Sequence, residues 1–226
     1  MGQWTAEIIA DLERVHALRK EREADASLEA RTAAIKRHQH ERFAHDYRAL
    51  LDNPRYRPAA RFFLDELYGP GDFAQRDAEF ARVVPAMSRL LPREVMQVVR
   101  QLSSLHVLTE ELDHEMAKAL NAEAVDAGSY RRAWSMVGRR ADRERQLALL
   151  LAIGEGLDRH TREPLIAATL RLMRGPAKAA GLGRLQAFLE TGLRAFRQMG
   201  DAQAFLATIA NTEGRVVDGY FRASKE

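Results

Sequence analysis

The spacing of large apolar residues constrains the fold of this chain more than any other feature, because they recur every three or four positions almost throughout. Phe62 and Phe63 share a helix face with Ala59, and the run from Leu185 to Met199 repeats the pattern. Such spacing predicts amphipathic helices that bury one face against neighbours. No stretch sustains the alternation typical of a half-buried strand. We therefore expect an all-α fold, a multi-helix bundle or orthogonal domain of roughly nine to eleven helices of ordinary length.

The stretch over residues 55–87 carries the clearest local signals, which predict two helices joined by a turn. Asn53 is a favoured N-cap and Pro54 suits a first helical position, so we expect the first helix to start there. Residues 68–72 (YGPGD) predict the turn, and their final aspartate is placed to cap the second helix. Pro85 lies inside the second pattern and predicts a kink or a local break.

Three runs of this sequence carry a family resemblance: FFLDELYGPGDFAQRDAEF, ADRERQLALLLAIGEGLD and RGPAKAAGLGRLQAFLETGLRAFRQMG. With them, the chain resembles a family of uncharacterised helical proteins found mainly in proteobacteria. The resemblance covers most of the chain after about Asp52. It implies a bacterial, cytoplasmic helical protein, and it implies no particular activity, cofactor or ligand.

Composition excludes several functional classes. The chain has 226 residues, 46% of them hydrophobic, which is enough for a well-filled core. It has no cysteine, so a thiolate nucleophile, a disulfide framework and a cysteine-ligated metal are all excluded. No run approaches the roughly 20 apolar residues that span a bilayer, and the first residues do not form a signal peptide. We expect a cytoplasmic protein without membrane contact, and 35 basic against 32 acidic side chains give no reason to expect nucleic acid.

The first 51 residues differ from the rest in their apolar pattern. A strong stripe predicts a helix from about Gln3 to Glu23, but beyond it only Leu28 and Ile35 are large and apolar before residue 37. Their seven-residue spacing gives the shortest apolar stripe, or seam, against which a partner helix could pack. We predict an arm over 1–51, one helix or a hairpin, that projects from a domain over 52–226 and pairs with another protein or with a second copy as a homo-oligomer such as a dimer. Packing of the arm on its own domain explains the pattern equally well.

Basic and histidine residues gather on one part of this arm. They are Arg31, Lys36, Arg37, His38, His40, Arg42, His45 and Arg48. We consider this a candidate interaction face, although a solvated helix face is the more usual explanation of such a run. The histidines lack the four-residue spacing that brings two imidazoles to one metal ion, so we expect no metal here.

Capping residues divide the rest of the chain into helices. Starts are predicted at Pro92, Thr109, Asp126 or Ser129, and Pro164, and ends at Gly138, Gly175-Pro176 and Gly200. The most apolar run, over residues 147–153, predicts a central helix that others surround. Gly154 and Gly156 would let a neighbouring helix cross closely.

Three charged residues fall on stripes that should face inward: Asp77, Arg143 and Glu213. A buried charge is tolerated when it is paired and hydrogen-bonded. We therefore predict that Arg143 forms an ion pair with Asp77, Glu213 or both. The cluster is either a core ion pair that fixes helix register or the polar lining of a ligand pocket, and the first is the commoner case.

Two histidines are candidate cofactor or metal ligands. His106 follows an apolar helical stripe, so an all-α pocket that binds haem through it is conceivable, but a hydrogen bond to backbone is the usual role of such a histidine. Glu111 and His114 have the spacing of a di-iron bundle motif. His114 lies opposite Leu112 and Met116, which predicts that it points to solvent. We expect no bound metal and no cofactor.

The sequence predicts a function without catalysis. No serine, histidine and aspartate stand in a recognisable nucleophile motif, and no glycine-rich fingerprint follows a strand. We expect a protein-interaction or self-association module that acts through the N-terminal arm. The alternative is an all-α domain that binds a small ligand or a cofactor, with Asp77, Arg143 and Glu213 as its polar lining.

Overall fold

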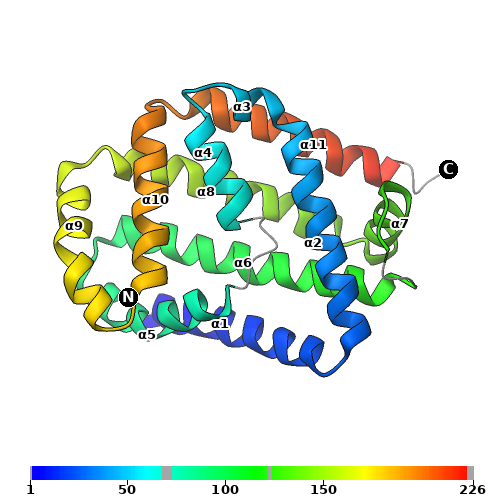
Figure 1. The fold of residues 1–226 in the computed structure, drawn as a ribbon, viewed down its shortest axis with the longest axis horizontal. Coiled ribbons are helices and arrows are strands. Elements are labelled where there is room, and N and C mark those ends of the chain that lie inside the picture. The colour runs from blue at the N-terminus through cyan, green and yellow to red at the C-terminus, as the bar shows by residue number, and fades with distance from the viewer. Residues whose placement is uncertain (1, 68–72, 122–123, 223–226) are drawn as a thin grey trace.

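The computed structural model describes residues 2–67, 73–121 and 124–222 (Figure 1). All regular structure within these ranges is helical, which confirms the predicted all-α class. The elements are α1 (Gly2–Glu23), α2 (Ala26–Asp46), α3 (Arg48–Asp52), α4 (Arg57–Phe62), the π-helix η1 (Phe63–Leu67), α5 (Ala74–Leu90), α6 (Arg93–Ala119), α7 (Ala127–Val137), α8 (Arg140–Thr161), α9 (Pro164–Ala179), α10 (Gly183–Met199) and α11 (Gln203–Arg222).

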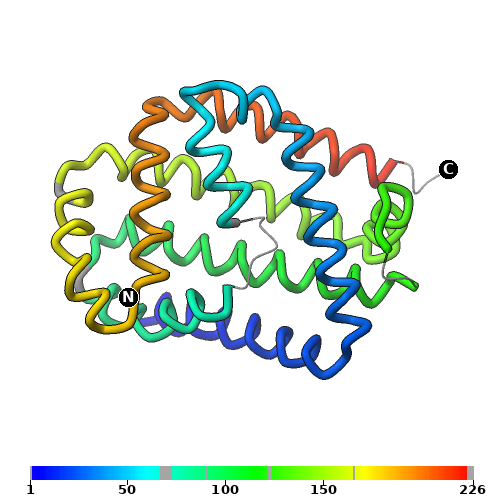
Figure 2. Tube along the Cα trace, in the orientation of Figure 1, coloured from blue at the N-terminus to red at the C-terminus, as the bar shows by residue number. Residues whose placement is uncertain are grey.

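The long helices form two crossed layers (Figure 1). One layer contains α1, α6, α8 and α11, which lie side by side in that order. The second layer contains α2, α4 and α10, and it crosses the first at a steep angle, as the trace in Figure 2 also shows. Helices α7 and α9 lie at opposite ends of the molecule. The cores between these layers therefore combine residues from distant parts of the sequence.

Helix α8 packs against α6 on one side and α11 on the other, as its apolar sequence predicts. Its Leu150 and Ile153 are buried in the largest hydrophobic cluster. A methyl group on Gly154 would lie 2.4 Å from Leu206 Cδ2, and one on Gly156 would lie 2.4 Å from Val98 Cγ2. Both glycines thus permit the close helix crossings expected of them.

The first 51 residues pack into this fold and do not project from it, so the predicted projecting arm is wrong. Helix α1 lies along α6 and α5, and it buries Ile8 and Val15 completely. Helix α2 crosses α6 and places Ile35 against Met116 and Tyr130. Helix α6 of the same chain covers the apolar seam, because α6 carries apolar residues on several sides. Whether residues 52–226 fold without this segment stays a prediction.

One helix start and one predicted break differ from expectation in and beside the stretch over residues 55–87. The first helix begins at Arg57, three residues after Pro54, because Asn53 Oδ1 accepts a hydrogen bond from the Arg55 N–H and forms a turn there. Helix α5 runs unbroken across Pro85. Packing of α5 against α1 and α10 compensates for the hydrogen bond that proline cannot donate. The turn predicted over residues 68–72 lies outside the described residues.

Two other predicted breaks are absent from the helices described here. Helix α6 is 27 residues long and continues through Thr109. The Thr109 hydroxyl accepts a hydrogen bond from Gln146 and does not cap a helix. Helix α9 continues past Gly175 and Pro176 to Ala179. Other caps are confirmed: Asp126 and Ser129 form a capping box at α7, and Gly138 and Gly200 end α7 and α10 with positive φ angles of 66° and 74°.

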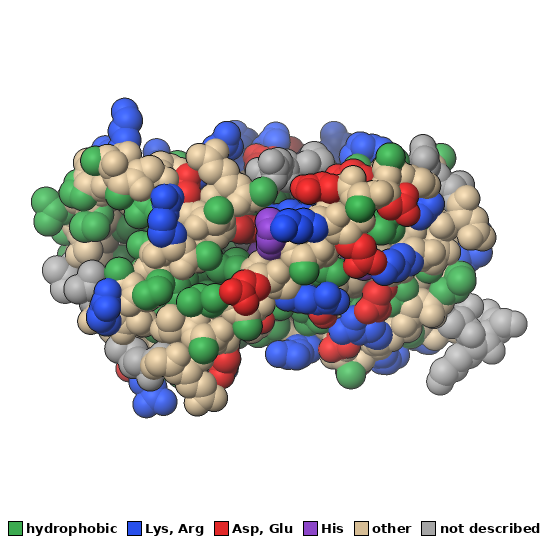
Figure 3. Space-filling view, turned by 90° about the horizontal axis from the view of Figure 1, so that it is seen from below, with side chains coloured by type: hydrophobic (Ala, Val, Ile, Leu, Met, Phe, Trp, Pro, Cys, Tyr) green, Lys and Arg blue, Asp and Glu red, His purple; other side chains and the backbone are tan. Residues whose placement is uncertain are grey.

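The charged surface is mixed in sign. On the face shown in Figure 3, basic and acidic side chains are interspersed and no broad patch of one charge is seen. Across the described ranges, no helix combines the length and the apolar character that crossing a membrane requires.

Candidate functional site

A cavity of about 90 Å³ lies where the two layers meet, between α1, α2, α5, α6 and α10. One part of its lining is apolar and comes from helix stripes that repeat every three or four residues. These residues are Leu12, Phe80, Met87, Val99, Leu102, Leu105, Leu185, Phe188 and Leu189, with Phe73 just before α5. The other part is polar and consists of Lys36, Gln39, Arg76, Asp77, Ser103, His106, Thr109, Glu110 and Asp113.

Asp77 on α5 is held by three basic groups. Its Oδ2 atom bonds Arg19 of α1, and it lies 2.8 Å from His106 Nε2 on α6. Arg76 Nε lies 3.7 Å from the other carboxylate oxygen, and its guanidinium stacks over Phe73 and Phe188. Burial alone would raise the pKa of Asp77, but the hydrogen bonds from His106 and Arg19 outweigh it and lower the pKa.

Glu110 on α6 forms a second buried network. Arg22 of α1 donates to its Oε2 at 2.7 Å, and Lys36 of α2 donates to its Oε1. Burial would raise the pKa of Glu110, but the positive charges of Lys36 and Arg22 outweigh it and lower the pKa to about 2. This carboxylate is therefore ionised, and it joins α1 and α2 to α6.

Asp113 is one turn further along α6 and has an unsatisfied oxygen. Its Oδ1 accepts a 2.7 Å hydrogen bond from Gln39, which also donates to the Tyr130 hydroxyl. Its Oδ2 is buried without a hydrogen-bond partner, and Lys36 Nζ is 4.0 Å away. Burial raises the pKa of this carboxyl group. Among the described residues that line the cavity, Asp113 alone has a buried side-chain polar atom without a partner.

The predicted ion pair between Arg143 and Asp77 or Glu213 is wrong. Arg143 lies 3.6 Å from the centre of the Trp134 ring and donates to the Met116 sulfur and to Gln146. Arg42 forms two hydrogen bonds to Glu213, which also accepts one from the Tyr47 hydroxyl. The three residues therefore lie in separate environments, and an aromatic face in place of a carboxylate stabilises the Arg143 cation.

His106 lines the cavity, but its Nε2 contacts the Asp77 carboxylate and not a backbone group as we expected. The cavity is far smaller than the roughly 300–1,000 Å³ of ordinary cofactor pockets, so the geometry does not favour haem there. The described residues contain no group of three or more side chains arranged to hold a metal ion.

The prediction that His114 points to solvent is wrong, because α1 covers it. The residue is 4% exposed, and its Nε2 lies 3.3 Å from Glu21 Oε2 without hydrogen-bond geometry. Burial lowers its pKa.

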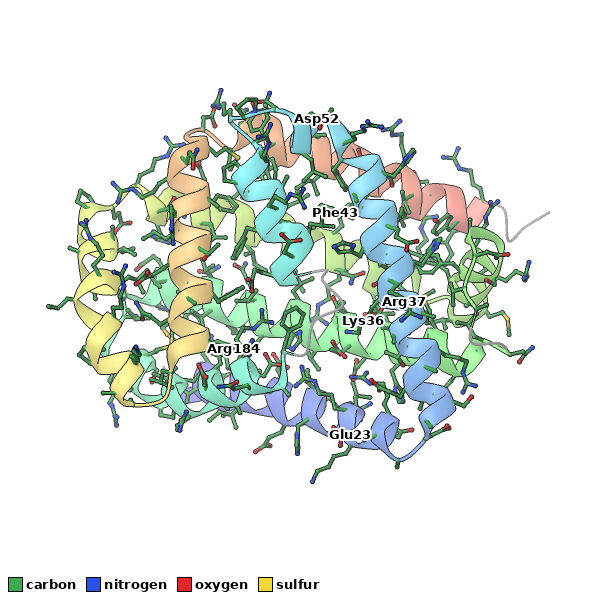
Figure 4. The ribbon with its side chains drawn as sticks, viewed as in Figure 1. Glu23, Lys36, Arg37, Phe43, Asp52 and Arg184 are labelled. Atoms are coloured by element: carbon green, nitrogen blue, oxygen red, sulfur yellow. The ribbon has the colours of Figure 1, made fainter. Side chains whose placement is uncertain are left out.

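The candidate interaction face on α2 is divided by the fold. Lys36 and Arg42 turn inward to Glu110 and Glu213, and Arg31 donates to the backbone oxygen of Ala117. His38 is half-buried against the Tyr130 ring. Arg37, next to Lys36 on α2 (Figure 4), is exposed, as is His45. The fold thus uses two of these residues, Lys36 and Arg42, as internal partners of acidic groups and leaves Arg37 and His45 at the surface.

Sequence reasoning missed Glu110, Asp113, Gln39 and Arg22. Glu110 and Asp113 are spaced three apart on the same face of α6 as the buried Ala117, which is a signal of buried charge. The break predicted at Thr109 concealed it, because acidic residues in a first helical turn need no partner from another helix.

Fold and cavity together define a class: an all-α domain whose crossed helices enclose a small cavity with an apolar wall and a buried ionic network. The chain belongs to the family described as Domain of unknown function (DUF8198), which matches residues 18–226. This match confirms the expected membership of an uncharacterised family, whereas its proteobacterial distribution stays a prediction. Neither a curated protein nor a solved structure matches the chain.

Proposed function

We propose that this domain binds a small organic molecule in the cavity between its two layers, without catalysis. The observation that carries the proposal is one cavity whose lining is apolar on one part and carries buried ionisable side chains, among them Asp77, His106 and Glu110, on the other. A cavity needed only for packing would be filled by side chains, since voids cost stability. A cavity with an apolar part and a polar part in its lining suits a ligand with an apolar body and one polar group.

The surrounding ionic network supports a preformed site. Asp77 and Glu110 connect α1, α2, α5 and α6, the helices that supply most of the cavity wall. Removing one partner of a buried pair is costly, so these helices hold a fixed arrangement. Binding to a preformed cavity avoids the entropy cost of ordering its walls.

A thermal-shift screen of single-ring and short-chain compounds, followed by native mass spectrometry of the hits, tests this proposal. Leu102→Trp should fill the cavity and abolish each shift, whereas Leu172→Trp is a matched control at a side chain that is 79% exposed and far from the cavity lining. If hits shift the Leu102→Trp variant as much as the unchanged protein, the cavity is not their site and the proposal is wrong.

Self-association remains a second candidate, on a different surface from the one first expected. On α9, Leu172 is 79% exposed and Met173 is 43% exposed, beside the exposed Arg171 and Arg174. A second copy that covers these apolar side chains would remove them from water. Analytical ultracentrifugation over a range of concentrations tests this, with Leu172→Glu expected to abolish any dimer. The cytoplasmic location and bacterial origin expected from the sequence also stay predictions.

A further inference from the structure

We propose that the groove between α9 and α10 binds an acidic amphipathic helix of a partner protein. The two helices lie side by side at one end of the molecule (Figure 1). The groove between them measures about 560 Å³ and is open to solvent. It is a different surface from the cavity of the proposed function, so the two sites are independent.

This part of the chain concentrates positive charge. Residues 164–199, which contain α9 and α10, include six basic side chains and one acidic side chain, although the whole chain has a net charge of only +3. The rest of the chain is therefore slightly acidic, and the net positive charge comes from these two helices. Such a surface attracts negatively charged partners and speeds their association.

Four of the six basic residues are arginines that line the groove. Arg171 and Arg174 come from α9, and Arg194 and Arg197 come from α10. Arg174 donates hydrogen bonds of 2.9 Å and 2.8 Å to Glu190 and so joins the two helices. The other three are exposed, and none has an acidic partner among the residues that the structure describes. Each is free to bind a carboxylate, which the guanidinium group fits well.

The groove also has apolar lining. Leu170 of α9 and Leu193 of α10 contribute to it, and both are half-buried. On α9 the lining runs from Ala167 to Arg174, a distance of about 10 Å or two helical turns. A helix with an apolar stripe and acidic flanks matches this surface. A nucleic acid matches it less well, because the described residues of the lining include no aromatic ring on which a base can stack.

A second copy of the chain is a poor occupant of this groove. A two-fold contact brings the same surface of each copy together, so the arginines of one copy would face and repel those of the other. The exposed Leu172 lies on a different face of α9, since it is two residues from Leu170 and therefore rotated by about 200° around the helix. Self-association through Leu172 would thus use a separate surface.

Fluorescence anisotropy with labelled peptides and the full chain tests the proposal. The probe is a stapled helix of about 15 residues, with leucine at every third or fourth position and glutamate on both sides of that stripe. A second peptide has glutamine in place of every glutamate. We expect the glutamate peptide to bind on the order of tenfold more tightly, because the free arginines gain carboxylate partners. Added salt should reduce this difference.

Surface variants locate the binding. Arg171→Gln with Arg194→Gln should weaken binding of the glutamate peptide about fivefold, because two free cations are removed. The matched control is Arg131→Gln with Arg132→Gln, which removes the same charge from exposed positions on α7 at the opposite end of the molecule. This control and Leu172→Ala should bind the peptide as the unchanged protein does.

Equal binding of the two peptides, or an equal loss in the α7 control, would overturn the proposal. Tighter binding of a labelled oligonucleotide or of phosphatidylserine vesicles would assign the groove to a nucleic acid or a membrane and overturn it as well. Leu102→Trp fills the cavity and should leave peptide binding unchanged. Failure of this proposal is therefore distinguishable from failure of the proposed function.

Discussion

Asp77 Oδ2 and His106 Nε2 lie 2.8 Å apart and join α5 to α6 beside the cavity. Because the carboxylate is ionised and accepts this bond, Nε2 carries the hydrogen in neutral His106 and Nδ1 is the ring's acceptor. Arg19 of α1 bonds the same oxygen, so one carboxylate oxygen connects three helices. The ionic groups of this site are therefore structural supports of the cavity wall.

Removing the Asp77 carboxylate should destabilise the protein. Asp77→Asn leaves Arg19 without its counter-charge, while Arg76 keeps Glu66 at 3.7 Å, and we expect the free energy of unfolding to fall by about 2 kcal/mol. His106→Gln should have a smaller effect, because Arg19 still satisfies the carboxylate. Urea unfolding measures both variants, and an Asp77→Asn variant as stable as the unchanged protein would contradict the network described here.

Glu110 should make stability depend on acid pH. Its pKa of about 2 in the fold lies below its ordinary value of 4.5, so its contribution is present above pH 4.5 and is lost as the pH falls toward 2. The full contribution is about 3 kcal/mol. Between about pH 6 and about pH 3, the unchanged protein should lose on the order of 2 kcal/mol more than Glu110→Gln does. Parallel pH profiles of the two proteins would show that this carboxylate is not stabilised by Lys36 and Arg22.

The same substitution at two buried arginines should have different effects on the free energy of unfolding. Arg143→Met removes a cation that has no carboxylate partner among the described residues, so we expect a change within about 1 kcal/mol or a gain in stability. Arg22→Met removes a partner of Glu110, which should cost about 3 kcal/mol. Chemical denaturation of both variants gives the comparison, and a strongly destabilised Arg143→Met would point to an ion pair that the contacts do not show.

Glycine substitutions should separate close helix packing from helix propensity. Gly154→Ala places a methyl group 2.4 Å from Leu206 Cδ2, so the buried Leu206 side chain or the two helices must shift, at a cost of about 1–3 kcal/mol. Gly214→Ala on α11 meets nothing within 4 Å and should stabilise its helix by about 0.5–1 kcal/mol. Thermal unfolding checks both, and a stabilised Gly154→Ala variant would show that α8 does not approach α11 so closely.

The sequence was informative where structure depends on neighbouring residues. The helical class, the Asp126 capping box and the central place of α8 follow from apolar spacing and from caps within one turn. The glycines that end helices, Gly138 and Gly200, follow from the same local rules, because the positive φ angle at a helix end favours glycine.

The sequence was uninformative where structure depends on which helices meet. A stripe such as that of α1 shows that a face is buried, but an outside partner and α6 satisfy it equally. Arg143 was correctly expected to be buried, yet its partner is the Trp134 ring and not a carboxylate. The site residues Glu110 and Asp113 were hidden for the same reason, since their partners Lys36 and Gln39 are 74 residues away.

Both Leu12 and Leu189 contribute to the wall of the cavity, although nearly the whole sequence separates them. During synthesis on the ribosome, α1 and α6 emerge long before α10 exists to cover them. The apolar faces of α1 and α6 therefore stay in contact with water or with a chaperone until α10 has been synthesised. Translation has to pass residue 189 before the wall of this cavity can be completed, so the cavity is one of the last parts of the nascent protein to form.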